Sequence, residues 1–135
     1  MDPGVYELPR ERLLAVLSDL PEGTRLYTLP SRIASKSAFF DAACSVLPMN
    51  PPLQRVNDVW DALDDSLGGG FLDRDDPLAV IVWEDPETLA EADPESGRIA
   101  VEILSGLPSD LLNPAFNAGF TRRVVVLLGS ATALG

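Results

Sequence analysis

Two short stretches of almost purely apolar residues constrain the fold of this sequence more than any other feature. Residues 78–83 read Leu-Ala-Val-Ile-Val-Trp, and residues 124–128 read Val-Val-Val-Leu-Leu. Neither stretch alternates polar with apolar residues, which is typical of strands that are buried on both faces of a parallel sheet. Both are far shorter than the roughly 20 residues that a helix needs to cross a bilayer. We therefore expect them to form the centre of a small parallel sheet.

Helical patterns alternate with these strands along the rest of the chain. Apolar residues at spacings of three and four, together with capping residues, predict helices over residues 9–20, 35–46, 53–67, 86–92 and 94–104. Strands are predicted over residues 25–29, 78–83 and 123–128. We expect Gly68-Gly69-Gly70 to end the third helix and residues 106–119 to be irregular. The fold class is therefore α/β, with a small parallel sheet of about three strands and packed helices.

The length of 135 residues fits a single domain, residues 1–135. Within it we expect an N-terminal extension with a short helix at residues 1–23, a core at 24–129 and a mobile tail at 130–135. The sequence begins Met-Asp-Pro-Gly, without a basic segment or a long apolar one, and this predicts a cytoplasmic protein.

The residues that most enzymes use for catalysis are scarce. The chain has no histidine, and its single cysteine, Cys44, lies in an apolar helical stretch where a buried hydrophobic role is expected. Histidine-dependent nucleophilic catalysis, an intrachain disulfide and a multi-cysteine zinc site are therefore excluded. We predict no catalytic residue, no cofactor and no metal ion.

The acidic residues are concentrated in one part of the chain. Residues 57–95 hold 13 acidic residues and a single basic one, Arg74, which gives this stretch a formal charge of −12 against −11 for the whole chain. Such a surface repels nucleic acid and anionic membranes and attracts cationic proteins. Within the predicted helix 53–67, Asp58, Asp61 and Asp65 fall on one face, beside an apolar face. Three carboxylates that repel one another do not stabilise a helix, so a role in binding is a reasonable alternative to simple solvation.

The segment around this acidic face resembles the binding helix of the barstar family of ribonuclease inhibitors. The tetrapeptide Trp-Asp-Ala-Leu at 60–63 carries the resemblance, together with the preceding Asn57-Asp58. The order of the predicted elements, including an apolar strand followed by two helices and a final aliphatic strand, agrees over about residues 24–129. The resemblance implies a barstar-like fold and an intracellular bacterial immunity protein, monomeric when free, that binds a basic ribonuclease or ribonuclease-type toxin without touching nucleic acid or a membrane.

The resemblance also implies roles for individual residues. Asp61 matches the aspartate that such inhibitors insert into the nuclease active site, in place of a substrate phosphate. Trp60 matches the neighbouring tryptophan at the edge of the interface and of the core. Asn57 stands where the family has a further contacting aspartate, a charge that Asp58 could supply, and Asp65 extends the acidic face. The predicted partner-binding residues are therefore Asp61, Trp60, Asp58, Asp65 and Asn57, with Glu102 and Asp110 as candidates for the acidic residues of the penultimate helix.

Two other classes of function stay open on the sequence. The first is an interaction module of the same fold with a partner that is not a nuclease. The second is a small acid/base or metal-dependent enzyme that uses Glu84 and Asp85, which follow a predicted strand at the edge where α/β sheets bind ligands. Exposed loop acids, with Asp85 capping the next helix, are the simpler interpretation of this pair.

Overall fold

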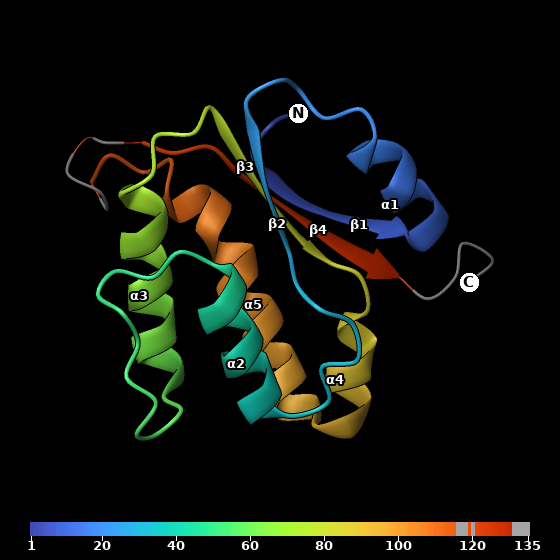
Figure 1. Ribbon diagram of the computed structural model, residues 1–135, viewed down its shortest axis with the longest axis vertical. Coiled ribbons are helices and arrows are strands. Elements are labelled where there is room, and N and C mark those ends of the chain that lie inside the picture. Colours follow the sequence, from blue (N-terminus) through green and yellow to red (C-terminus); the bar gives the residue numbers. More distant parts are fainter. Residues whose placement is uncertain (116–118, 120, 131–135) are drawn as a thin grey trace.

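The central sheet consists of the two apolar strands flanked by two less apolar ones. In a computed structural model, which describes residues 1–115, 119 and 121–130, β3 (Leu78–Trp83) and β4 (Val124–Ser130) lie side by side and are buried almost throughout (Figure 1). β2 (Thr24–Thr28) pairs with β3, and β1 (Gly4–Pro9) pairs with β4. All pairs are parallel and the order is β1-β4-β3-β2. The predicted α/β class and parallel sheet are confirmed, with one strand more than expected.

The additional strand comes from the N-terminal residues, which we expected to form an extension with only a short helix. β1 pairs along its length with β4, from Gly4 beside Val125 to Pro9 beside Ser130. Exposed and half-buried residues alternate over its first four positions, since successive side chains point to opposite faces of the sheet. None of its residues is fully buried, because an edge strand is covered less completely than a central one. The assignment of residues 1–135 to a single domain remains a prediction, and the expected mobile tail falls largely outside the described residues.

Helices cover both faces of the sheet, as Figure 1 shows. On one face, α1 (Arg10–Leu17) packs Leu13 against Val80, Val82, Val125 and Leu127 of the central strands. On the other face lie α2 (Lys36–Val46), α3 (Trp60–Leu72) and α5 (Pro94–Asp110), while α4 (Pro86–Ala92) packs on α5. Side chains alternate along β3, so that Ala79, Ile81 and Trp83 enter this second, larger core. None of the helices that the structure describes has the length and apolarity of a membrane-crossing segment.

Local capping signals predicted the start of two helices correctly. Ser35 Oγ accepts a hydrogen bond from the Ala38 amide at 3.0 Å, at the start of α2. Asp93 accepts one from the Ser96 amide at 3.2 Å, at the start of α5. Both side chains satisfy amides that the first helical turn leaves without a partner. α5 nevertheless continues through Gly106 and a buried Pro108 to Asp110, whereas we predicted its end near residue 104.

Both ends of the third helix differ from the prediction. Residues 53–59 are not helical, and α3 begins only at Trp60, after Val59 in an extended conformation. The three glycines do not end the helix, which runs through them to Leu72. A side chain on Gly69 or Gly70 would collide with the backbone carbonyl of Asn50 or Pro48, respectively. The glycines therefore let residues 48–50 lie directly on α3, where the Asn50 amide donates to the Ser66 carbonyl at 3.0 Å.

We expect Gly70→Ala to destabilise the protein by about 1–3 kcal/mol, the usual cost of overpacking a tightly packed site. The added methyl group meets backbone atoms of Pro48 and Met49, which cannot rotate away as a flexible side chain would. Gly106→Ala on α5 is the matched control, because its nearest neighbour is the Asp110 side chain at 3.6 Å. That change gains up to about 1 kcal/mol of helix propensity. Urea denaturation distinguishes the two, and equal stabilities would show that the 48–50 contact is not tight.

Candidate protein-binding site

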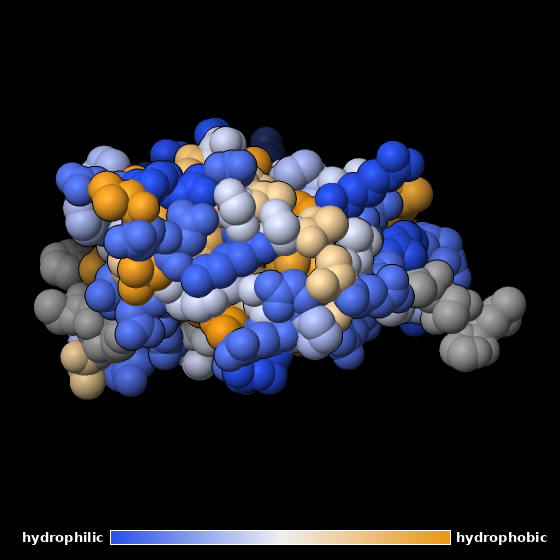
Figure 2. Space-filling view, turned by 90° about the horizontal axis from the view of Figure 1, so that it is seen from below, coloured by the Kyte–Doolittle hydropathy of each residue, from blue (hydrophilic) through white to orange (hydrophobic). Residues whose placement is uncertain are grey.

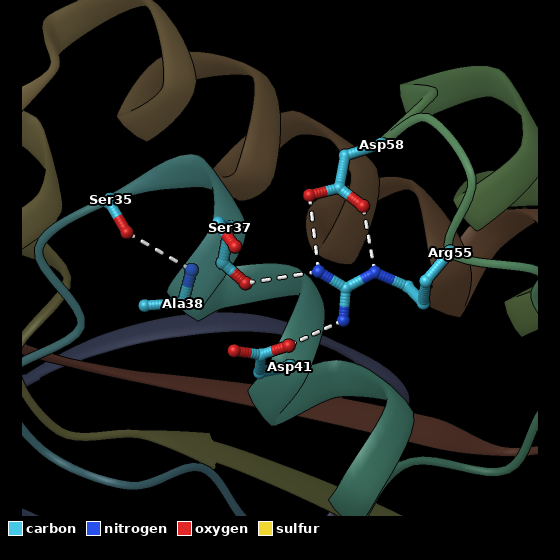
Figure 3. Close-up of polar contacts among 6 residues, drawn as sticks. All are labelled: Ser35, Ser37, Ala38, Asp41, Arg55 and Asp58. Atoms are coloured by element: carbon cyan, nitrogen blue, oxygen red, sulfur yellow. Dashed lines mark hydrogen bonds and ion pairs between the residues drawn. The ribbon is translucent and has the colours of Figure 1, made fainter.

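The segment that leads into α3 is held by one arginine. Arg55 donates from Nε to Asp58 Oδ1 at 2.7 Å and from Nη2 to Asp58 Oδ2 at 3.1 Å (Figure 3). It also donates from Nη1 to Asp41 on α2 at 2.5 Å and reaches the Ser37 carbonyl at 3.4 Å. Its guanidinium carbon lies 5.6 Å from the centre of the Phe40 ring. Arg55 thus joins residues 51–59 to α2 by one ion pair, one hydrogen bond and a ring contact, and it forms a second ion pair within its own segment.

This arrangement changes the expected role of Asp58. Asp58 lies before the helix rather than on it, so the predicted helical face of Asp58, Asp61 and Asp65 does not form as a single stripe. Hydrogen bonds from Arg55 lower the pKa of Asp58 below its ordinary value of 3.8, and they raise the pKa of Arg55. The Asp58 carboxylate thus already forms an ion pair within the free protein. Residues 53–59 are not helical, and their path places Arg55 beside both Asp58 and Asp41 of α2.

Because the pKa of Asp58 is lowered on folding, its ion pair stabilises the protein above pH 3.8 and loses this effect as the pH falls through the lowered pKa. We expect wild type to be more stable than Asp58→Asn at neutral pH, with the difference shrinking steadily below about pH 4. Urea denaturation of both proteins between pH 7 and pH 2.5 measures this. A difference that is independent of pH would show that the carboxylate charge of Asp58 does not contribute.

Trp60, the first residue of α3, packs against Phe40, the ring that Arg55 also contacts. Its ring centre lies 4.9 Å from that of Phe40 and 6.0 Å from that of Phe39, both fully buried on α2. The ammonium group of Lys36 lies 5.4 Å from the Trp60 ring, within the range of a cation–π contact. Trp60 is half-buried, so one side belongs to the core and the other lines an open hollow with Asp58, Asp61 and Ile99. Trp60 thus lies at the edge of the core, and the place in an interface that the family resemblance implies for it stays a prediction.

Four carboxylates gather along α3 and the end of α5. Asp61 and Asp65 are exposed one helical turn apart, and Asp64, Asp65 and Asp110 line one hollow together with Gly68, Gly69 and Leu72. Partial burial, and then repulsion from Asp110, Asp65 and Asp61, raise the pKa of Asp64. We call Asp61, Asp64, Asp65 and Asp110 the acidic patch. The sequence suggested Asp110 only through the family resemblance, and α5 brings it here because the helix is longer than predicted.

Five acidic residues outside the acidic patch are paired with an arginine. Asp41 and Asp58 pair with Arg55, Asp76 with Arg74, Glu87 with Arg10, and Glu102 with Arg98. In the part of the chain that the structure describes, no residue of the acidic patch forms an ion pair. Like charges on adjacent turns repel, so this arrangement costs stability unless a partner supplies positive charge. Among the described residues, no group of three His, Cys, Asp or Glu side chains could hold a metal ion.

The remaining residues singled out in the sequence lie apart from the acidic patch. Asn57 is exposed, in the segment held by Arg55. Asp85 precedes α4, but its side chain accepts no hydrogen bond from the amides of that helix, so the predicted capping is wrong. Its Oδ2 instead accepts from the Arg32 amide at 2.9 Å and from the Thr88 hydroxyl at 3.4 Å, which connects the loop after β2 to the start of α4. Glu84, beside it, is exposed. Cys44 is partly buried on α2, where burial raises the pKa of its thiol and disfavours the thiolate.

The surface at the end of the molecule where α3 begins is mostly polar. Figure 2, a view from this end, shows blue hydrophilic residues over most of the surface and apolar residues only in small separate groups. Val56 and Val59 are the exposed large apolar residues of the segment held by Arg55, with 83% and 48% of their surface accessible. Such a surface suits a polar, charged partner with small apolar contacts.

The parallel sheet, its helices and the acidic patch place the chain among small α/β domains with an acidic helical surface. Residues 25–117 match the model of the family Barstar (barnase inhibitor), and the chain belongs to this family. No curated protein and no solved structure matches the chain. The description of the family is that of an inhibitor of barnase.

Proposed function

We propose that this protein inhibits a basic ribonuclease or ribonuclease-type toxin by covering its active site with the start of α3. The observation that carries the proposal is the acidic patch, whose carboxylates have no cationic partner among the described residues. Asp61 and Asp65 are the principal binding residues in this proposal, because both are exposed on a rigid helix. Trp60 supports them from the core, and Asn57 contributes at the rim.

The chemistry of a ribonuclease active site explains why carboxylates suit it. Such a site holds cationic side chains arranged around a substrate phosphate. A carboxylate has the same sign of charge and accepts two parallel hydrogen bonds from an arginine. On a helix, its position is fixed before binding, so little conformational entropy is lost on association.

Asp58 has a smaller role in binding in this proposal than the sequence predicted. Its carboxylate is paired with Arg55 in the free protein, so a partner would have to compete with that ion pair. Asp58 therefore contributes less to binding than Asp61 or Asp65, although it stands nearer to the position of the family's further aspartate. Its effect is indirect, through the conformation of residues 51–59.

Capture from a lysate of the source organism, followed by mass spectrometry and a titration of ribonuclease activity, tests the proposal. We expect the captured partner to be a basic ribonuclease and its activity to disappear at a molar ratio of about one. A captured partner without nuclease activity would contradict ribonuclease inhibition and favour an interaction module of the same fold. Barnase serves as a defined probe in the same assay.

The rate of association should depend strongly on salt. The stretch of residues 57–95 carries a formal charge of −12, and attraction between this surface and a basic protein accelerates encounter. At physiological ionic strength the field extends only about 8 Å, compared with about 30 Å at 0.01 M. Stopped-flow measurements across this range should therefore show association slowing about tenfold or more. An association rate that does not change with salt would show that the acidic surface serves only solubility.

A further inference from the structure

We propose that Arg55 is the positioning residue of the binding surface. Its side chain holds residues 51–59 on α2, and in doing so it sets the start of α3 and the orientation of Asp61. The consequence for binding rests on the proposed function, whereas the effect on residues 51–59 is a property of the free protein.

The hydrogen bonds of Arg55 connect its own segment to α2, and we call this set of contacts the clamp. It comes from a segment without helix or strand, and its three nitrogens each donate to an acceptor: Asp58, Asp41 and the Ser37 carbonyl. Asp58 lies in the same segment as Arg55, whereas Asp41 and Ser37 lie on α2. Figure 3 shows Asp58 and Asp41 on opposite sides of the guanidinium group. The planar fork of arginine suits this geometry, and a lysine ammonium cannot reproduce a paired bond to Asp58 while also reaching Asp41.

Leu53 packs against the core, but few contacts other than those of Arg55 hold the residues that follow it. Val56 has 83% of its surface accessible, and Gln54 and Asn57 are exposed. The ends are tied separately, by the Asn50 amide to Ser66 and by Trp60 to Phe40. Without Arg55, the carboxylates of Asp41 and Asp58 would face each other unpaired and repel. The segment would then separate from α2 without unfolding the sheet.

Loss of the clamp should affect the two rate constants of binding differently. Arg55 neutralises Asp41 and Asp58, so its removal makes the surface more negative and does not slow encounter with a cationic partner. The loosened segment must then be ordered on binding, which costs free energy and appears mainly as faster dissociation.

Nuclear magnetic resonance relaxation on the free full-length protein tests the clamp. We expect amide order parameters for residues 53–59 near 0.85 in wild type and below about 0.6 in Arg55→Ala and Arg55→Lys. The order parameters of β3 and β4 should stay unchanged. Arg98→Ala is the matched control, because it removes the same charge from an exposed ion pair with Glu102 on α5. Unchanged order parameters for residues 53–59 in Arg55→Ala, or low values in wild type, overturn the proposal.

Binding kinetics with barnase as the probe test the positioning role. We expect dissociation from Arg55→Ala to be about tenfold faster than from wild type, with association no slower. Unchanged dissociation despite a loosened segment would overturn the positioning role. If wild type neither binds barnase nor captures a basic ribonuclease, the proposed function fails, and the relaxation data alone then decide whether the clamp exists.

Discussion

Asp61→Ala should weaken binding to the ribonuclease partner by about 2–5 kcal/mol, a range that includes measurements on the barnase–barstar pair itself. The substitution leaves cationic groups of the partner desolvated and without their carboxylate. Folding stability should change by less than about 0.5 kcal/mol, because Asp61 is exposed and has like-charged neighbours. Calorimetric titration and thermal melts of wild type and variant measure both quantities.

Two further variants make this test specific to the acidic patch. Asp65→Ala removes the carboxylate one turn along α3 and should weaken binding comparably. Asp19→Ala removes the same charge from an exposed position next to α1, on the other face of the sheet, and should change binding by less than about 0.5 kcal/mol. If Asp61→Ala behaves like Asp19→Ala, the role assigned to Asp61 is wrong.

Trp60→Ala should lower the stability of the fold by about 3 kcal/mol, at the lower end of the cost of removing a core aromatic side chain. Trp60 is only half-buried, but it packs on Phe39 and Phe40 and lies under Lys36. For a chain of this length, the loss corresponds to a melting temperature lower by about 10 °C. Binding should weaken as well, since Trp60 is the first residue of the helix that carries Asp61.

Trp60→Phe is the control, because it keeps an aromatic ring against Phe40 and should recover most of the stability. A melting temperature for Trp60→Ala equal to that of wild type would show that the aromatic cluster does not stabilise the start of α3. The contrast between Trp60 and Asp61 distinguishes a residue that shapes the surface from one that contacts the partner.

The sequence by itself determined the centre of the fold and the class of the protein. The strands that the structure has at Leu78–Trp83 and Val124–Ser130 were predicted at 78–83 and 123–128, because a wholly apolar stretch of that length has few stable environments other than a sheet covered on both faces. Ser35 and Asp93 marked helix starts because capping depends on residues only three positions apart. The family was predictable from Trp-Asp-Ala-Leu and the order of elements, and the match of residues 25–117 to the family model confirms this prediction.

Only the tertiary structure decided the features that depend on residues far apart in the chain. β1 carries a weak local signal, and its place in the sheet comes from pairing with β4, more than a hundred residues away. The glycines at 68–70 predict a helix end locally, yet the helix continues through them, and Gly69 and Gly70 are needed because residues 48–50 approach too closely for side chains. Arg55 forms an ion pair with Asp41 that no local spacing predicts, since Asp41 lies 14 residues away on α2. The acidic patch likewise needs α5 to bring Asp110 beside Asp64, because charge repulsion and pairing depend on distance in space rather than along the sequence.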